Sequence, residues 1–350
     1  MIKEENSILV SVCTLTYNHV PYIRQCVESL LMQKTNFDFE ILIHDDASTD
    51  GNQSIIREYE EKYPQIIKPI YQKENQHSKG VRITPQFQLP RAKGKYIAFC
   101  EGDDYWTDEL KLQKQVDFLE KNEDYGLVHT DYKVFNQSQN AFAAALFSNP
   151  PCGNVFEQLL YSDFICTLTV MARTNLLIPA SRSEVFDLLK PKMGDYPLWL
   201  FISRHSKIGY INDCTGVYRV LDKSMSHFTD MAKQFAFHLS AWKVSEFFAQ
   251  GTSQAYWVKF FEQRFVRQWF FRALKANDKS AALSILNHID GKGIKHYFYR
   301  LCVKSDLLKN VALFSVSVKN KICAMRTLQI AEKSKRQKLE RLSNDEDLKR

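Results

Sequence analysis

Residues 96–106 read YIAFCEGDDYW, and this stretch predicts both the fold class and the place of a functional site. Residues 96–100 form a short apolar run, which is typical of a strand buried in a sheet. Three acidic residues follow within four positions, at 101, 103 and 104. Because open α/β sheets bind ligands beyond the carboxyl ends of their strands, the stretch predicts a buried strand that ends in an acidic ligand site.

Strand and helix patterns alternate on both sides of this stretch. Residues 8–16, ILVSVCTLT, form a β-branched apolar run that favours a strand buried on both faces of a parallel sheet. A helix is expected next, because Pro21 suits a first helical turn and Ile23 and Val27 begin one apolar face. This order predicts an α/β fold with a mainly parallel sheet flanked by helices. Further strands are expected at residues 39–44, 66–71 and 126–132, and further helices at 53–62 and 108–121.

The strand pattern ends near residue 230, so we expect an α/β domain over residues 1–230 and a helical region with a basic tail over residues 231–350. The chain has 47 Lys and Arg against 40 Asp and Glu, a net charge of +7. Residues 291–350 hold 15 basic and 6 acidic residues, which leaves 32 and 34 in the first 290. The excess positive charge therefore belongs to the tail. It suggests an anionic partner for the tail, either a membrane surface or nucleic acid, and the alternative is an ordinary solvated surface.

Two helical stretches of the C-terminal region combine apolar and basic residues. Residues 256–271, YWVKFFEQRFVRQWFF, interleave aromatic side chains with Lys259, Arg264 and Arg267, and apolar residues recur at helical spacing over residues 311–325. Each pattern is typical either of a helix packed against its own protein or of one lying at a membrane interface, and the aromatic and basic residues at 256–271 could also stack on bases. For residues 256–271 we favour packing against the protein.

Cysteine usage and hydropathy predict the compartment. The eight cysteines are scattered without a C-x-x-C pair, which is typical of reduced, buried thiols. No stretch approaches the roughly 18 consecutive apolar residues of a membrane span. We expect a cytoplasmic protein, with peripheral contact at the inner face of the membrane if the tail binds lipid.

Two further acidic segments accompany the one at 101–104. In HDDASTDG, residues 44–51, helix capping explains Ser48, Thr49 and Asp50, whereas the adjacent Asp45 and Asp46 are more than capping needs. Their carboxylates are suited to accept hydrogen bonds from a nucleotide base or ribose. In GDYPLW, residues 194–199, Asp195 precedes a helix-starting run and is either an N-cap or a general base.

The acids at 101–104 predict a divalent metal site. Glu101, Asp103 and Asp104 repel one another unless a cation or a proton relieves them, and hard cations such as Mn²⁺ or Mg²⁺ take oxygen ligands. Gly102 permits the tight turn that brings two side chains toward one point. The alternative is a solvated turn, which the preceding buried strand and the following Trp106 disfavour.

Four ordered motifs resemble family 2 glycosyltransferases of the GT-A fold, of the bacterial surface-polysaccharide type. The resemblance covers roughly residues 7–230 and leaves the C-terminal third uncovered. The motifs are VSVCTLTYNHVPYIRQCVESLL at the start, HDDASTDGN, YIAFCEGDDYW followed by KLQKQVDFL, and GDYPLW.

The resemblance implies roles for individual residues. It places Thr16, Tyr17 and Asn18 along the nucleotide, and Asp46, supported by Asp45, at the base and ribose.

The acids at 101–104 receive separate roles from the resemblance. It makes Asp103 and Asp104 metal ligands on the diphosphate. Glu101 stands where the family more often has Asp, which points it to the ribose or a substrate hydroxyl. Asp195 becomes the base that deprotonates the acceptor.

In the family, a further element closes over the diphosphate. Its nearest equivalents here are Tyr218, Arg219 and His227, and His227 would be a third metal ligand. The alternative is that Arg219 and His227 have a structural role.

The resemblance thus implies a metal-dependent, inverting glycosyltransferase. It would move a sugar from a nucleoside-diphosphate sugar to a saccharide or lipid-linked saccharide hydroxyl in cell-surface polysaccharide assembly, with no nucleic-acid partner. One alternative is a sugar nucleotidyltransferase, which the absence of a Gly-rich, basic phosphate loop near residue 16 disfavours. The other is a non-catalytic basic binding or scaffold protein, against which the acids at 46, 103, 104 and 195 argue.

Overall fold

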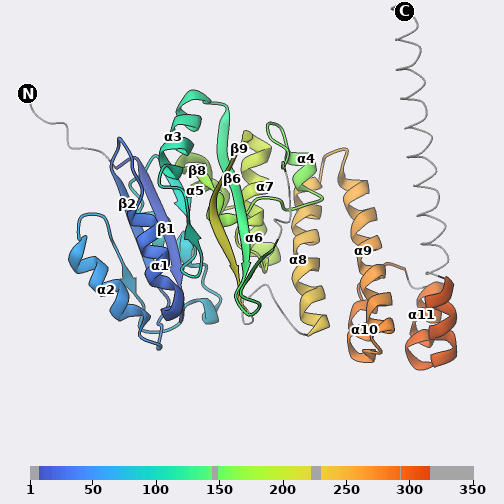
Figure 1. The fold of residues 1–350 in the computed structure, drawn as a ribbon. Helices are drawn as coiled ribbons and strands as arrows, with labels where there is room; N and C mark the ends of the chain where they lie inside the picture. The colour runs from blue at the N-terminus through green and yellow to red at the C-terminus, as the bar shows by residue number, and fades with distance from the viewer. Residues whose placement is uncertain (1–7, 144–148, 222–229, 292, 316–350) are drawn as a thin grey trace, which may run out of the picture. The chain divides into compact units, whose positions relative to one another are not determined.

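Strand β1 (Val10–Thr16) lies at the centre of the parallel half of the sheet (Figure 1). The computed structural model describes residues 8–143, 149–221, 230–291 and 293–315. β1 pairs in parallel with β2 (Phe39–Asp45) and β4 (Tyr96–Phe99), and β2 pairs in parallel with β3 (Ile70–Tyr71). Thr16 is in register with Asp45, so the carboxyl ends of β1 and β2 meet at one edge.

The alternation of side chains along β1 and β2 builds two cores. Val12 and Ile43 face one cluster, together with the apolar stripe of α1 (Val20–Leu31), whereas Cys13 and Leu42 face another on the opposite side of the sheet. Both clusters are buried, which explains why these strands read as continuous apolar runs. The helices α1 and α2 (Asn52–Lys62) follow β1 and β2, and α3 (Lys111–Lys121) follows β4 after the short strand β5 (Tyr105–Trp106).

The second half of the sheet mixes strand directions. β8 (Met171–Arg173) pairs antiparallel with both β4 and β6 (Tyr125–Asn136), and β6 pairs in parallel with β9 (Lys207–Val220). Among the described strands four pairings are parallel and four are antiparallel. The order is β3-β2-β1-β4-β8-β6-β9-β5, with β5 (Tyr105–Trp106) at one edge and β7 (Ala141–Ala143) paired to β6.

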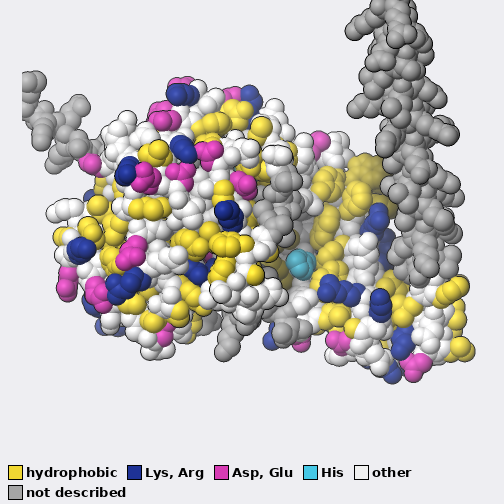
Figure 2. Space-filling view, viewed as in Figure 1, with side chains coloured by type: hydrophobic (Ala, Val, Ile, Leu, Met, Phe, Trp, Pro, Cys, Tyr) yellow, Lys and Arg dark blue, Asp and Glu magenta, His cyan; other side chains and the backbone are white. Residues whose placement is uncertain are grey.

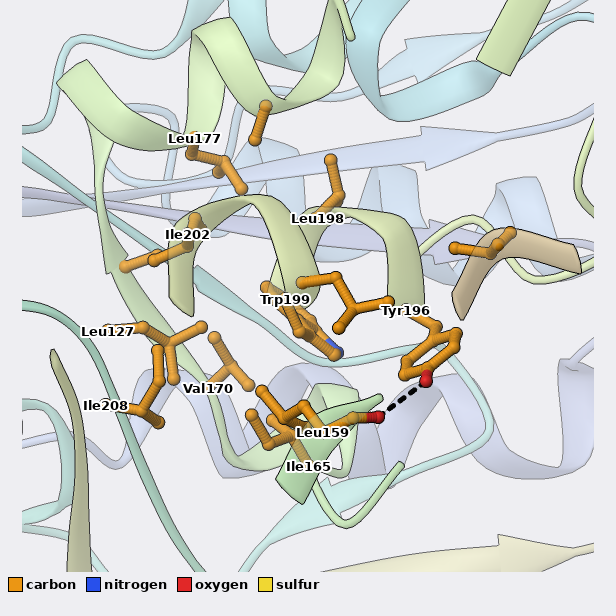
Figure 3. Packing of buried hydrophobic residues seen from close by; sticks show 14 of the residues in the cluster. Leu127, Leu159, Ile165, Val170, Leu177, Tyr196, Leu198, Trp199, Ile202 and Ile208 are labelled. Atoms are coloured by element: carbon orange, nitrogen blue, oxygen red, sulfur yellow. Dashed lines mark hydrogen bonds between the residues drawn. The ribbon is translucent and has the colours of Figure 1, made fainter. Parts of the chain in front are cut away.

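Short helices fill the connections and cover this half. Figure 3 shows α7 (Tyr196–His205), whose Tyr196 and Trp199 point into a buried cluster, and the Tyr196 hydroxyl donates a 2.6 Å hydrogen bond to the Leu159 carbonyl. This bond fixes the start of α7. The other short elements are η1 (His77–Lys79), η2 (Thr84–Gln88), η3 (Leu89–Arg91), α4 (Phe156–Leu159), η4 (Thr167–Thr169), α5 (Thr174–Ser181) and α6 (Val185–Leu189).

The remainder of the described chain is helical, as expected. Its helices are α8 (Met231–Ala249), α9 (Ala255–Lys275), α10 (Lys279–Leu286) and α11 (Ile294–Lys304). The chain divides into two compact units: residues 1–229 with 236–259, and residues 230–235 with 260–350. In the first, Val244 and Phe248 of α8 join the core; in the second, the rings of Phe235 and Phe265 stack 6.0 Å apart. No helix in the described ranges is long and apolar enough to cross a membrane.

The α/β prediction is confirmed, with differences where elements are short. The expected strands at residues 8–16, 39–44, 96–100 and 126–132 correspond to β1, β2, β4 and β6. The strand expected over residues 66–71 is reduced to Ile70–Tyr71 and an isolated bridge between Ile41 and Ile67. Of the predicted amphipathic run 311–325, residues 316–325 lie outside the described residues, as does most of the basic tail.

Candidate active site

Asp45 organises the loop that follows β2. Its Oδ1 accepts hydrogen bonds from the backbone N–H of Ser48 (2.9 Å) and from the side chain of Gln53 (2.7 Å). Its Oδ2 accepts one from the Asn52 amide (2.8 Å), which also donates to the Thr16 hydroxyl (3.1 Å). Asp45 is fully buried, so it reaches a ligand only indirectly, through the loop that it holds.

Asp46 is also buried and fastens a second loop. Its two carboxylate oxygens accept the backbone N–H groups of Gln76 (2.8 Å) and His77 (3.0 Å). Nε2 of His44 lies 3.7 Å from Asp46 Oδ1, and burial of the His44 ring lowers the pKa of that imidazole. The carboxylate thus holds the segment around Gln76 at the end of β2, beside the place predicted for the nucleotide.

The loop after β1 forms a rim beside these acids. Asn18 has a left-handed backbone (φ 54°); its N–H donates to the Ser48 hydroxyl (2.9 Å), and its Oδ1 accepts the N–H of Thr49 (2.8 Å). Tyr17 is 44% exposed, whereas Thr16 is buried. Of the three residues predicted along the nucleotide, Tyr17 and Asn18 are therefore the ones whose surface is available to a ligand.

Asp50 contacts the first residues of two helices, as the capping interpretation of this segment expects, whereas the Ser48 hydroxyl accepts the N–H of Asn18 instead. Its Oδ1 accepts the N–H of Asn52 (3.0 Å), the first residue of α2, and its Oδ2 accepts the N–H of Val20 (2.9 Å), the first residue of α1. Backbone N–H groups at a helix start have no partner within the helix. One carboxylate therefore caps the two helices that follow β1 and β2.

The turn after β4 is pressed against the end of β1. The N–H of Gly102 donates to the Leu15 carbonyl (2.9 Å), and a Cβ at Gly102 would lie only 2.6 Å from Cβ and Oγ1 of Thr16. Any larger residue would push the two strand ends apart. This close approach sets Glu101 and Asp103 directly beside the β1 loop.

The carboxylates of this turn act on one another. Burial, followed by the charges of Asp103 and Asp195, raises the pKa of Glu101 to about 8. Burial, followed by Asp103 and Glu101, raises the pKa of Asp104 well above its usual range. Because like charges raise each other's pKa values mainly at short range, Asp195 lies near Glu101.

Arg219, on β9, ties the acidic turn to the opposite part of the sheet. Its backbone N–H donates to Asp104 Oδ1 (2.7 Å), and its Nε donates to the Asp103 carbonyl (2.7 Å). The residue is 6% exposed, so its guanidinium supports the turn from within the protein. Its other partners are Oε1 of Gln25 (2.8 Å), Oε1 of Gln137 (3.1 Å), and the rings of Tyr22 (4.7 Å) and Tyr105 (5.1 Å).

The Asp195 carboxylate accepts two hydrogen bonds from other residues. It is the N-cap of α7, where its Oδ1 accepts the N–H of Tyr196 (2.9 Å). Its Oδ2 accepts the hydroxyl of Thr167, in the turn η4, at 2.5 Å. Burial, followed by the charge of Asp195, raises the pKa of nearby Asp163 well above its usual range. Asp195 thus caps a helix and also lies near Glu101 and Asp163.

The acidic turn fits a cation that is shared with a substrate. The described residues include no group of three His, Cys, Asp or Glu side chains that would hold a metal alone. Mg²⁺-type ions, however, are commonly bound by one or two carboxylates together with substrate phosphates, and crowded carboxylates with raised pKa values favour a bound cation. The Asp103 side chain is 19% exposed and Asp104 is 2% exposed, so Asp103 is the more accessible. His227 lies outside the described residues.

Three residues near the acids were absent from the sequence predictions. They are Asp163, Thr167 and His19, whose Nε2 lies 3.9 Å from Asp103 Oδ2. His19 was within reach of sequence reasoning, since it follows the predicted Thr16–Asn18 loop directly. Asp163 and Thr167 lie in a segment without clear periodicity, and no local pattern connects them with Asp195.

Comparison with known proteins concerns the chain as a whole. The sequence model of the family described as Glycosyl transferase family 2 matches residues 11–172. An uncharacterized protein of Mycobacterium tuberculosis is 44% identical over 113 residues, which is only about a third (32%) of its length and of this chain. The UDP-Glc:alpha-D-GlcNAc-diphosphoundecaprenol beta-1,3-glucosyltransferase WfaP of Escherichia coli is 32% identical over 222 residues, covering 62% of this chain and 80% of WfaP.

A solved structure shares the fold. The mannosyltransferase PcManGT from Pyrobaculum calidifontis, in complex with GDP-Man and Mn²⁺, aligns with a TM-score of 0.51 over 91% of each chain. At 14% identity this likeness concerns the fold alone, and it agrees with the predicted GT-A-like architecture. The match over most of WfaP, together with the family model, shows that this chain belongs to glycosyltransferase family 2.

Proposed function

We propose that this protein transfers a sugar from a nucleoside-diphosphate sugar to an acceptor hydroxyl, with inversion at the anomeric carbon. The observation that supports this most strongly is the acidic turn after β4, where the charges of Asp103 and Asp195 act on Glu101 and those of Asp103 and Glu101 act on the buried Asp104. A base and a group of cation-binding carboxylates are the two components that such a transfer requires.

Asp195 is the base in this proposal. It takes the proton of the acceptor hydroxyl, whose oxygen forms a bond to the anomeric carbon while the bond to the diphosphate oxygen breaks on the opposite face. The electron pair of the broken bond leaves with the diphosphate. Asp103 and Asp104 would hold a Mn²⁺ or Mg²⁺ ion, which when bound stabilises negative charge on the leaving diphosphate.

The donor nucleotide lies along the ends of β1 and β2. Tyr17 is exposed for contact with it, and Thr16 and Asn18 shape the rim. Asp45 and Asp46 hold the loops beside the base and ribose. Glu101 then faces the ribose or a substrate hydroxyl, and Arg219 acts by holding the metal-binding turn. WfaP, named for UDP-Glc, and PcManGT, solved with GDP-Man, support a nucleotide-sugar donor.

The acceptor in this proposal is a saccharide carried on a lipid diphosphate, for assembly of a cell-surface polysaccharide. The name of WfaP, which contains diphosphoundecaprenol, supports this class. The protein would work in the cytoplasm and touch the anionic inner face of the membrane through its second unit. There Ile294 (89%), Tyr297 (65%) and Phe314 (71%) are exposed, and Lys295 lies beside Ile294. Figure 2 shows Lys and Arg side chains beside hydrophobic ones over the helices from α9 onward.

Donor screening tests the activity. The full-length protein is incubated with a panel of nucleotide sugars, a lipid-diphosphate-linked saccharide and Mn²⁺ or Mg²⁺, and released nucleoside diphosphate is measured. We expect release that requires both acceptor and metal, and a product whose anomeric proton coupling shows inversion. Release that persists unchanged in EDTA would remove the metal from the proposal, and pyrophosphate formed from a nucleoside triphosphate and a sugar phosphate would indicate a nucleotidyltransferase.

Membrane contact has a separate test. The full-length protein is floated with vesicles of phosphatidylcholine alone or of phosphatidylcholine with phosphatidylglycerol. We expect flotation only with the anionic vesicles and its decrease at high salt. Equal recovery with both vesicle types would contradict an electrostatic contact.

A further inference from the structure

We propose that Thr167 is a positioning residue that sets the orientation of the Asp195 carboxylate for proton removal. This inference rests on the proposed function, in which Asp195 is the base. The two residues are 28 positions apart, and the Thr167 hydroxyl donates to Asp195 Oδ2 at 2.5 Å. A hydroxyl bonded to a carboxylate is a strong, short contact of the charge-assisted type.

Two anchors are needed to fix the plane of a carboxylate. The terminal torsion of an Asp side chain is broad, so one hydrogen bond leaves the group free to rotate about it. In Asp195 the N–H of Tyr196 holds Oδ1 at 2.9 Å, and the Thr167 hydroxyl holds Oδ2. Each carboxylate oxygen has two lone-pair sites, so Oδ2 retains one that can take a proton from the acceptor.

The turn that carries Thr167 is itself fixed by buried side chains. The indole N–H of Trp106 donates to the Leu168 carbonyl (2.9 Å), and the Gln115 amide donates to the Thr169 carbonyl (2.8 Å). The ammonium group of Lys111 also reaches that carbonyl, at 3.4 Å. All three donors follow the acidic turn in the chain and come from β5 and α3. The position of the Thr167 hydroxyl is therefore set by residues that directly follow the acidic turn, whose carboxylates are the proposed metal ligands.

Thr169 provides a contrast within the same turn. Its hydroxyl donates to the Cys166 carbonyl (2.6 Å), a local bond that stabilises the turn alone. The hydroxyl of Thr167 instead crosses to another element and contacts the proposed base. Helix capping does not account for this contact, because Oδ1 of Asp195 already caps α7. A replacement of Thr169 is thus a matched control for the general effect of losing a hydroxyl from η4.

The experiment compares Thr167→Val, Thr167→Ala and Thr167→Ser with Thr169→Val in the full-length protein. Transfer kinetics, nucleoside-diphosphate binding by calorimetry and thermal unfolding are measured for each. We expect Thr167→Val and Thr167→Ala to lower kcat by about 10- to 100-fold, the loss expected for one charge-assisted hydrogen bond, with donor KM and nucleotide binding unchanged. Thr167→Ser keeps the hydroxyl and should retain most of the activity, and Thr169→Val should keep kcat.

A double-mutant cycle separates positioning from folding. In the Asp195→Asn background, Thr167→Val should cause no further loss of the residual rate, because a residue that acts through Asp195 has nothing left to position. The same loss in both backgrounds, wild-type kcat in Thr167→Val, or an equally impaired Thr167→Ser would overturn the inference. Full activity of Asp195→Asn would instead refute the proposed base, so the two failures are distinguishable.

Discussion

The backbone N–H of Arg219 donates a 2.7 Å hydrogen bond to Oδ1 of Asp104, which lies 115 positions earlier in the chain. Both groups are buried, and the bond joins the end of β9 to the acidic turn after β4. Asp104 therefore has a structural role in addition to the metal-binding role proposed for it. A replacement that keeps the acceptor oxygen but loses the charge, compared with one that loses both, separates the two roles.

We expect Asp104→Ala to lower the free energy of unfolding by about 1–3 kcal/mol, because it leaves the Arg219 N–H buried without its acceptor. The same change should weaken metal-dependent nucleotide binding. Asp104→Asn keeps an acceptor oxygen but loses the charge, so it should lose metal-dependent binding while retaining most of the stability. Urea denaturation and calorimetry with and without Mn²⁺ measure both effects. Equal destabilisation by the two variants would contradict a structural role for the Arg219 bond.

Gly102→Ala should separate the ends of β1 and β4. The added Cβ would lie 2.6 Å from Thr16 and 3.1 Å from Nδ1 of His19, so the acidic turn must shift. We expect a lower unfolding midpoint and weaker nucleotide binding, measured by denaturation and calorimetry. Gly194→Ala is the matched control, since nothing lies within 4 Å of a Cβ there and its backbone has no positive φ. A Gly102→Ala protein that binds nucleotide as the control does would show that the turn tolerates displacement.

The buried Lys111 should make stability depend on pH. Burial lowers the pKa of its ammonium group from 10.5 to about 7. Below pH 7 the group is charged in both the folded and the unfolded chain, so the full cost of burying the charge is present. Between the two pKa values the unfolded chain binds more protons, so stability rises with pH across this window.

Lys111→Met lacks this contribution. The free energy of unfolding of the wild type minus that of Lys111→Met should therefore increase from below pH 7 to about pH 9. Urea denaturation of both proteins in matched buffers measures the difference and removes the contribution of other titrating groups. A difference that is constant over this range would mean that Lys111 stays charged in the core, next to the Trp106 ring 4.4 Å away.

Asp195→Asn should nearly abolish sugar transfer, by about 100- to 10,000-fold, while nucleotide binding stays close to wild type. The amide cannot accept the proton, but Asn caps a helix as well as Asp does. The unfolding midpoint should therefore change little, which distinguishes loss of the base from loss of the fold. Substantial activity of this variant with a true acceptor would show that another group removes the proton.

The strands and helices of the first half of the fold can be predicted from the sequence. β1, β2 and β4 are continuous apolar runs because both of their faces are buried, and α1 and α3 have regular apolar stripes. β8 and β5, with three and two residues, are too short for any periodicity to mark them. Their antiparallel pairing, which makes the sheet mixed, comes from contacts between distant segments.

The acids of the site were identifiable for a similar reason. Asp45, Asp103 and Asp195 each follow or begin a recognisable element, so their place at the edge of the sheet follows from the pattern of strands and helices. The hydrogen bonds that Asp45 and Asp46 accept, and the one that Thr167 donates to Asp195, depend on how the loops pack against one another in the folded chain. Nothing in the local sequence encodes those distances.

The support of η4 by Trp106, Lys111 and Gln115 bears on how members of this family can be recombined. A chimaera of two family members joined between α3 and η4 takes η4 from one protein and the side chains that hold it from the other. A junction after β9 leaves these partners, and the Arg219 bond, within a single parental block. Chimaeras made to exchange C-terminal regions should therefore be joined beyond residue 220.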